Sequence, residues 1–251
     1  MDAARALPSA IYGERFELAF IDADGVRCRE PLLTSWNTPF ERCGQIRRFT
    51  SRRGQRSFSG LWYFATSHEH VGYESWLEHD RLILLDADPD VVAVASQPFW
   101  LCWQDDEERP VRHAPDYFVR RRDGTAVVID VRADERIGPK DAAKFTATAR
   151  ACESVGWGFE RVGALDPVLA TNLRWLSGYR HQRYHRPGHA EQLRRVFARP
   201  VPLMEGASEV GDPLGVLPTL FHMLWLRELQ TDLRSSPLNE TSLIRVAGEP
   251  R

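Results

Sequence analysis

Two short apolar segments that carry acidic residues, Ala114–Phe118 and Val127–Arg132, constrain the fold of this chain more than any other feature. The pair Asp123-Gly124 between them is typical of a tight turn, so the sequence predicts a β-hairpin. Residues two apart in a strand point to the same face, so Asp130 and Arg132 are expected to face the same way. If the turn brings Asp116 beside Asp130, two carboxylates and one cation converge on one small volume. Such a group can hold a divalent metal and a phosphate together.

Composition indicates a soluble globular protein. The chain has 251 residues, of which 43% are hydrophobic and 27% charged, and a formal net charge of −2. Overall charge therefore does not indicate nucleic-acid binding, which would have to come from local clusters of basic residues. The four cysteines lack the spacing of a zinc site, no signal peptide is apparent, and no apolar run is long enough to span a bilayer. We expect no zinc, no membrane and a cytoplasmic location, with nucleoid association when the protein is on DNA.

The pattern of elements predicts a mixed α/β fold. A strand is expected near Phe16–Phe20, an aromatic strand at 58–64 and a helix at 73–85 with an apolar stripe. Strands follow from Val91, broken at Pro98, and again from Phe99. After the hairpin, a helix at 139–155, a short strand and a helix capped by Asp166 complete a sheet flanked by helices.

The composition changes after Tyr179. Residues 180–195 are basic and interleaved with aromatic and histidine residues, which allows either nucleic-acid contact or a solvated linker. Three helices and then two short strands follow, which is the pattern of a winged helix. The alternative is a helical appendage that completes the core.

A second basic stretch, residues 42–56, is either a solvated loop or a phosphate-contacting segment. Arginine suits phosphate because its planar fork grips two oxygens at once. The residues that we expect to bind DNA come from both basic stretches: Arg47, Arg48, Arg52, Arg53, Arg183, Arg186, Arg194 and Arg195.

Pro115-Asp116 followed by Asp130-x-Arg132 resembles the signature of PD-(D/E)xK nucleases. The stretch from Tyr73 to Pro98 strengthens this, and residues 58–180 look like the N-terminal catalytic domain of TnsA-like endonuclease subunits of heteromeric transposases. The resemblance implies a restriction-endonuclease-like α/β fold with a winged-helix-like C-terminal domain. It implies an N-terminal extension at 1–57, a nuclease-like domain at 58–180 and the winged-helix-like domain at 181–251.

The same resemblance implies a Mg²⁺-dependent endonuclease, with Mn²⁺ as a substitute, that hydrolyses phosphodiester bonds at the 5′ ends of a transposon. A separate DDE transposase subunit would cut and join the 3′ ends. By position, Glu78, Asp116 and Asp130 match the metal-binding carboxylates, and Arg132 matches the catalytic lysine. Apart from the resemblance, the carbonyl of Val131 is a further candidate ligand. Gln97 and Glu74 are expected to support the site.

Position 132 departs from the family, where lysine is typical. Arginine keeps the charge but does not readily lose a proton. Two alternatives therefore stay open: a catalytically silent DNA-binding or bridging subunit, and a stand-alone nuclease of the restriction or repair type. Two structural interpretations also stay open: Asp116 as a cap of the Arg120-Arg121-Arg122 region, and Asp130 with Arg132 as a surface ion pair.

Overall fold

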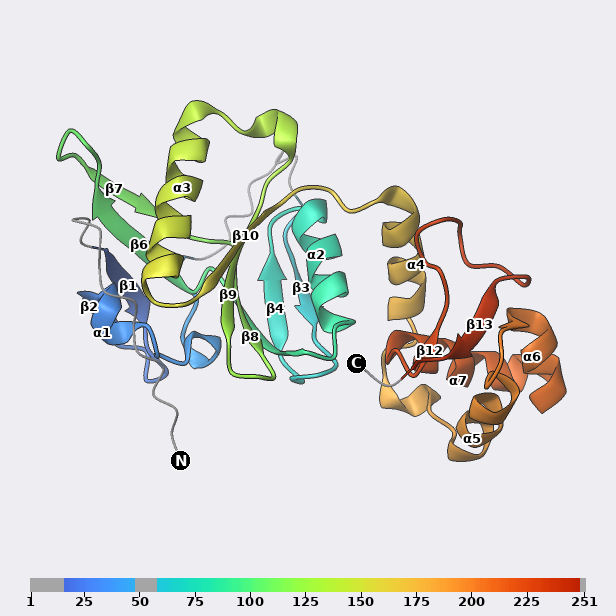
Figure 1. Ribbon diagram of the computed structural model, residues 1–251. Coiled ribbons are helices and arrows are strands. Elements are labelled where there is room, and N and C mark those ends of the chain that lie inside the picture. Colours follow the sequence, from blue (N-terminus) through green and yellow to red (C-terminus); the bar gives the residue numbers. More distant parts are fainter. Residues whose placement is uncertain (1–15, 48–57, 249–251) are drawn as a thin grey trace. The chain divides into compact units, whose positions relative to one another are not determined.

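The computed structural model describes residues 16–47 and 58–248 and divides the chain into two compact units (Figure 1). The first unit comprises the chain up to His79 together with Asp90–Ala164. The second comprises Asp80–Pro89 together with the chain from Leu165 onward. These limits divide the chain differently from the expected domains, because residues before 58 contribute strands to the first unit.

The first unit contains an antiparallel four-stranded sheet in the order β2-β1-β6-β7. Strand β1 pairs with β2 on one side and with β6 on the other, although some 80 residues of chain separate β1 from β6. The strands are β1 (Glu17–Ile21), β2 (Arg27–Pro31), β6 (Phe99–Gln104) and β7 (Pro110–His113).

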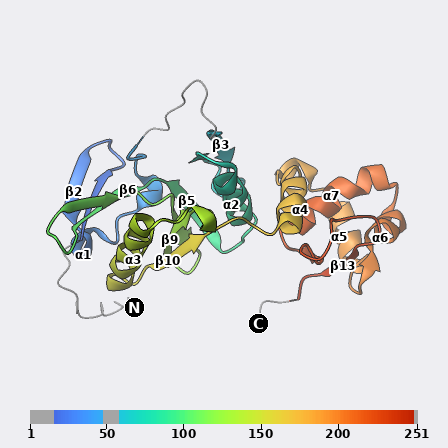
Figure 2. The same cartoon turned by 90° about the horizontal axis from the view of Figure 1, so that it is seen from above.

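A second, mixed sheet has the order β10-β9-β8-β5. All six residues of β9 are buried, as expected for an apolar strand covered on both faces. Strands β9 and β10 are parallel, and helix α3 (Pro139–Ser154) forms the crossover between them (Figure 2). The strands are β5 (Val91–Ser96), β8 (Tyr117–Arg121), β9 (Ala126–Val131) and β10 (Gly158–Val162).

An aromatic cluster joins these two sheets into one core. Phe40 is fully buried and packs against Phe20 and Phe99, which come from the first sheet, and against Phe118 from the second. Its ring also meets Trp157, which precedes β10, at a centroid distance of 5.9 Å. Edge-to-face pairs of this kind are favourable beyond the area they bury. This core fixes the first sheet, which ends in β7, against the second sheet, which carries the hairpin.

Smaller elements complete the first unit and lead into the second. A hairpin of β3 (Gly60–Tyr63) and β4 (His70–Tyr73) precedes helix α2 (Trp76–Asp86), which begins in the first unit and continues into the second. Three short helical elements also occur here: α1 (Leu32–Ser35), η1 (Phe40–Arg42) and η2 (Asp134–Arg136). The sequence placed the start of α2 three residues too early, so Glu74 precedes the helix.

The second unit is mainly helical, with a small sheet in the order β11-β13-β12. Asp166 caps its helix α4 by accepting two backbone N–H bonds of 2.9 Å, as the sequence predicted. The elements are α4 (Pro167–Ser177), η3 (Gln182–Tyr184), α5 (Pro187–Val196), β11 (Val201–Pro202), α6 (Leu203–Val210), α7 (Pro213–Trp225), β12 (Leu229–Gln230) and β13 (Leu243–Val246).

The predicted fold class holds at the level of a mixed α/β protein with several sheets and flanking helices. The strands β2, β4, β7 and β11 were not anticipated from the sequence. Among the described residues, no helix combines the length and the apolar character needed to cross a membrane.

Candidate active site

The hairpin that the sequence predicted is present, and its register places the two aspartates opposite each other. Strands β8 and β9 are antiparallel, with Tyr117 opposite Ile129. The next position along this register puts Asp116 opposite Asp130. Gly124 has a φ of +83°, a conformation that glycine adopts without strain, and it allows the tight turn.

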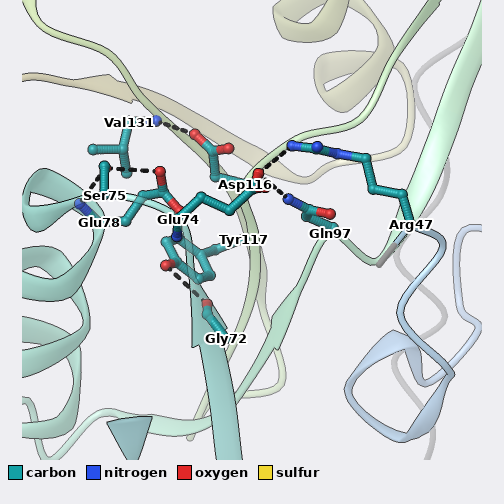
Figure 3. A network of polar contacts seen from close by, with 9 residues as sticks. All are labelled: Arg47, Gly72, Glu74, Ser75, Glu78, Gln97, Asp116, Tyr117 and Val131. Carbon is teal, nitrogen blue, oxygen red and sulfur yellow. Dashed lines mark hydrogen bonds and ion pairs between the residues drawn. The ribbon is translucent and has the colours of Figure 1, made fainter. Parts of the chain in front are cut away.

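Asp116 lies close enough to the carboxylates of Glu78 and Asp130 for their charges to act on it. Its Oδ2 accepts a hydrogen bond of 2.7 Å from the backbone N–H of Val131 (Figure 3). The surrounding protein desolvates the carboxylate, and the charges of Glu78 and Asp130 add to this, so its pKa lies well above the ordinary value of 3.8. The hydrogen bond from Val131 favours the charged form but does not offset the other effects.

Glu78, in the first turn of α2, is buried and tied to the residues just before the helix. Its carboxylate accepts hydrogen bonds of 2.8 Å from the backbone N–H of Glu74 and from the Ser75 hydroxyl. Ser75 in turn accepts a hydrogen bond from the backbone N–H of Glu78. Burial raises the pKa of Glu78 even though these hydrogen bonds oppose the shift. Glu78 therefore stabilises the start of α2 and also places a carboxylate beside Asp116.

Glu74 and Gln97 form a supporting network at the same place (Figure 3). The Gln97 Nε2 donates to Glu74 Oε2 at 2.8 Å, and Arg47 forms an ion pair with the same oxygen. Gln97 adopts a left-handed backbone with a φ of +47° between β5 and β6. Its backbone N–H donates to the Asp116 carbonyl, and its carbonyl accepts from the N–H of Ile46. One strained residue thus positions both Asp116 and the segment that carries Arg47.

Asp130 is 2% exposed and has a histidine partner that the sequence analysis missed. His113 Nε2 lies 2.9 Å from each oxygen of the Asp130 carboxylate. His113 ends β7, and only the pairing of β7 with β6 brings it to the hairpin. The interpretation of Asp130 and Arg132 as a surface ion pair is wrong, because Asp130 is buried and makes its contact with His113.

Arg132 faces the same cavity but its guanidinium is held at the rim. Its Nη2 forms an ion pair of 3.1 Å with Asp141, and about half of its side chain is exposed. Asp141, in the first turn of α3, also accepts a hydrogen bond from the Gly138 N–H at 3.4 Å. The expected cation is therefore present near the carboxylates, and its direct partner is a carboxylate on α3.

These side chains line one cavity of about 340 Å³ within the first unit. The acidic and basic groups around it are nearly balanced in number. Its lining comprises Arg47, Glu74, Glu78, Trp100, Arg112, His113, Ala114, Asp116, Asp130, Val131, Arg132, Asp141, Lys144 and Phe145. The structure thus brings together Glu74, Glu78, Asp116, Asp130, Val131 and Arg132 around one cavity.

The donor atoms of this cavity suit a hard divalent cation. Carboxylate and carbonyl oxygens are the ligands that Mg²⁺ prefers, and a cation would offset the desolvation and the repulsion that raise the pKa values of Asp116 and Glu78. In the part of the chain that the structure describes, however, no three acidic, histidine or cysteine side chains are close enough to hold a metal as they stand. A metal would therefore compete with His113 for Asp130 and with Ser75 for Glu78.

The residues expected to bind DNA are distributed differently. Arg47 lines the cavity, whereas Arg48, Arg52 and Arg53 lie outside the described residues. The other four belong to the second unit, where Arg183 lies over the Tyr184 ring. Arg194 pairs with Glu228 and Arg195 with Glu191, so the charges of these two arginines are partly neutralised within the unit.

Comparison with known proteins finds a similar family for part of the chain, the part that carries the hairpin. A search among curated proteins found no matching sequence. Residues 88–162 match the family model described as TnsA-like endonuclease N terminal. The matched segment contains Gln97, Asp116, Asp130 and Arg132, and it begins after Glu78. This match confirms the resemblance to TnsA-like endonucleases over the part of the chain that carries the hairpin.

Proposed function

We propose that this protein is a metal-dependent DNA endonuclease that hydrolyses phosphodiester bonds at the 5′ ends of a transposon. The observation that carries the proposal is the convergence of Glu78, Asp116 and Asp130 on one cavity, where desolvation and the charges of the other two carboxylates raise the pKa of Asp116. Uncompensated acidic charge of this kind is costly to folding and is common where function requires it. The segment that matches the TnsA-like family holds two of the three residues.

Glu78, Asp116 and Asp130, with the carbonyl of Val131, are the groups that we propose hold Mg²⁺ or Mn²⁺. When bound, the cation would lower the pKa of water and neutralise charge on the phosphate. The backbone N–H of Val131 orients Asp116, and His113 fixes the direction of the Asp130 carboxylate. Both arrangements hold the oxygens in place before any ligand arrives, which reduces the reorganisation that binding requires.

We propose that the second unit is a winged-helix-like module that works with a DDE transposase subunit on transposon DNA. The order α5, β11, α6, α7, β12, β13 and the sheet order β11-β13-β12 support this proposal. Helix α7 contains neither arginine nor lysine, so base readout by this helix is not part of the proposal. Arg183 and Arg186 are the residues of this unit that we propose contact phosphates.

The central experiment compares Asp116→Ala with Asp106→Ala, which removes an exposed carboxylate from the turn between β6 and β7. Calorimetry should show Mg²⁺ or Mn²⁺ binding to the wild type and to Asp106→Ala but not to Asp116→Ala. Nicking of transposon-end DNA, measured with the DDE subunit present, should fall at least about 10³-fold in Asp116→Ala only. Undiminished nicking by Asp116→Ala would refute the proposal.

A second function is a catalytically silent bridging subunit. The specific observation in its favour is that His113 contacts both oxygens of Asp130 while Asp141 holds Arg132. This function predicts that metal binding does not depend on Asp116 or Asp130. A stand-alone nuclease of the restriction or repair type is a third alternative. A DDE transposase gene beside this one would favour the transposition function.

A further inference from the structure

Lysine is scarce in this protein, and one of its lysines lines the candidate active site. Of the 33 lysine and arginine residues, only Lys140 and Lys144 are lysines. Both lie on α3, one turn apart. Lys140 is exposed, whereas Lys144 is partly buried and lines the cavity with Asp116 and Asp130.

The other cationic groups of the cavity already have partners. Arg47 pairs with Glu74, Arg132 pairs with Asp141, and His113 contacts Asp130. The Arg112 guanidinium lies over the Trp100 ring, 4.5 Å from its centroid. Within residues 16–47 and 58–248, the Lys144 ammonium makes no hydrogen bond or ion pair that would engage it. It is therefore the cation of this cavity that is available for an incoming anion.

We propose that Lys144, rather than Arg132, is the catalytic cation that contacts an oxygen of the scissile phosphate. This inference rests on the proposed nuclease function, because it assigns a residue to the same site. Arg132 is then a positioning residue, which acts by holding Asp141 and the first turn of α3.

The placement of α3 supports this division of roles. Asp141, Lys144 and Phe145 are three and four residues apart, so they lie on one face of the helix, and all three line the cavity. Phe145 also packs against His113, with ring centroids 6.0 Å apart. The contact of Arg132 with Asp141 therefore sets the orientation of the same helical face that carries Lys144.

The chemistry of the two side chains favours Lys144 for this role. An ammonium is a compact charge with three donors that rotate freely, so it can follow a phosphate oxygen as charge develops. The Arg132 guanidinium would have to leave Asp141 before it could contact a phosphate. Lys144 would not have to leave a partner among the described residues before it contacted a phosphate.

The first test uses the near-absence of other lysines. The wild-type protein is treated with an amine-acylating reagent, with and without saturating transposon-end duplex and Ca²⁺, and modification is quantified by mass spectrometry. We expect the duplex to reduce acylation of Lys144 at least about fivefold and to leave Lys140, the matched control, unchanged. Equal reactivity of Lys144 with and without bound duplex would overturn the proposal. This reading does not depend on whether the protein cuts DNA by itself.

The second test measures single-turnover cleavage by variants in the presence of the DDE subunit. Lys144→Ala should lose about 10²- to 10³-fold, the scale for removal of one group that stabilises developing charge, and Lys140→Ala should stay within about twofold. Lys144→Arg should recover part of the loss, and Arg132→Ala should lose less than about tenfold. Full activity of Lys144→Ala beside an inactive Asp116→Ala would overturn this inference alone. Full activity of Asp116→Ala would instead overturn the proposed function.

Discussion

Among the buried carboxylates of helix α2, Glu78 in the first unit and Asp80 in the second have fundamentally different surroundings. Asp80 receives two charged hydrogen bonds from Arg174, of 2.8 and 2.7 Å. Burial instead raises the pKa of Glu78, and the charge of Glu78 adds to the effect of desolvation in raising the pKa of Asp116. These carboxylates are two residues apart in sequence. Asp80 has an arginine as its direct partner, whereas the partners of Glu78 are a hydroxyl and a backbone N–H.

Two buried amide side chains, one in each unit, also differ in how fully they are hydrogen-bonded. In the second unit, Asn172 is 2% exposed and makes three hydrogen bonds of 2.8–3.0 Å to the loop between β12 and β13. In the first unit, the Oε1 of buried Gln97 has no hydrogen-bond partner among the described residues. Asn172 thus fastens this loop to α4 in the second unit, whereas in the first unit Glu78 and Asp116, two carboxyl groups with raised pKa values, meet at one cavity.

The largest expected effect on stability is therefore in the second unit. Asn172→Ala removes three hydrogen bonds and leaves the carbonyls of Leu233 and Ser236 without their donor. We expect the free energy of unfolding to fall by about 3 kcal/mol. Urea denaturation checks this, with Asn37→Ala, an exposed asparagine, as the control that should change stability by less than about 0.5 kcal/mol. If the free energy of unfolding fell by less than about 1 kcal/mol in Asn172→Ala, these hydrogen bonds would not be a main source of stability in the second unit.

Asp80→Asn should destabilise the protein by about 1–2 kcal/mol, because the amide cannot accept both charged hydrogen bonds from Arg174. The loss is limited because half of the Arg174 side chain is exposed and can be hydrated instead. Thermal unfolding of Asp80→Asn measures this loss, and Asp106→Asn, at an exposed aspartate of the first unit, serves as the comparison. An unchanged melting temperature would show that this ion pair contributes nothing measurable.

Unlike the two substitutions above, Asp116→Asn should increase the free energy of unfolding at neutral pH. Because the folded-state pKa of Asp116 lies above its ordinary value of 3.8, folding is favoured most where the carboxyl is protonated in both states. That favourable contribution is lost as the pH rises from 3.8 through the folded-state pKa. Asparagine never ionises, so the variant avoids the loss.

We expect the melting temperature of Asp116→Asn to exceed that of the wild type by about 2–4 °C at pH 8, the shift that 1 kcal/mol causes in a chain of this size. The difference should disappear below about pH 3.8, where Asp116 is protonated in both states. Calorimetric scans across pH provide the measurement. A lower melting temperature for Asp116→Asn at pH 8 would contradict the view that this site carries uncompensated charge.

The smallest effect should come from the surface of the second unit. Arg195→Gln breaks an exposed ion pair with Glu191, one helical turn away, and should cost about 0.3–0.5 kcal/mol. The same substitution should lower affinity for duplex DNA less than Arg183→Gln does, because Glu191 partly neutralises Arg195. Fluorescence anisotropy at two salt concentrations distinguishes them. Equal losses of DNA affinity in Arg195→Gln and Arg183→Gln would show that the ion pair between Arg195 and Glu191 opens when DNA binds.

Much of the site could be predicted because its signals are local in sequence. The hairpin follows from two apolar segments and the Asp123-Gly124 turn, and the antiparallel register then places Asp116 opposite Asp130. The cap at Asp166 is similarly local, since its side chain bonds backbone groups two and three residues away. Glu78 was found through the family resemblance, although its hydrogen bonds with Ser75 follow a short-range helix-start pattern.

His113, Asp141 and Lys144 escaped prediction for a physical reason. No sequence spacing pairs His113 with Asp130, because the contact requires β7 to dock on β6 and the first sheet to pack on the second through Phe40. Asp141 and Lys144 reach the cavity only because α3 crosses from β9 to β10 with one face toward the hairpin.

By itself, the sequence determined the local conformations and the presence of acidic groups: the hairpin, the helix cap and the pair Asp116 and Asp130. Only the tertiary structure decided which charges meet, so that Asp130 contacts His113, Arg132 contacts Asp141 and Lys144 is left available. The reason is that backbone preferences act between near neighbours in the chain. Electrostatic interactions depend on distances through space, which only the packed sheets and helices set.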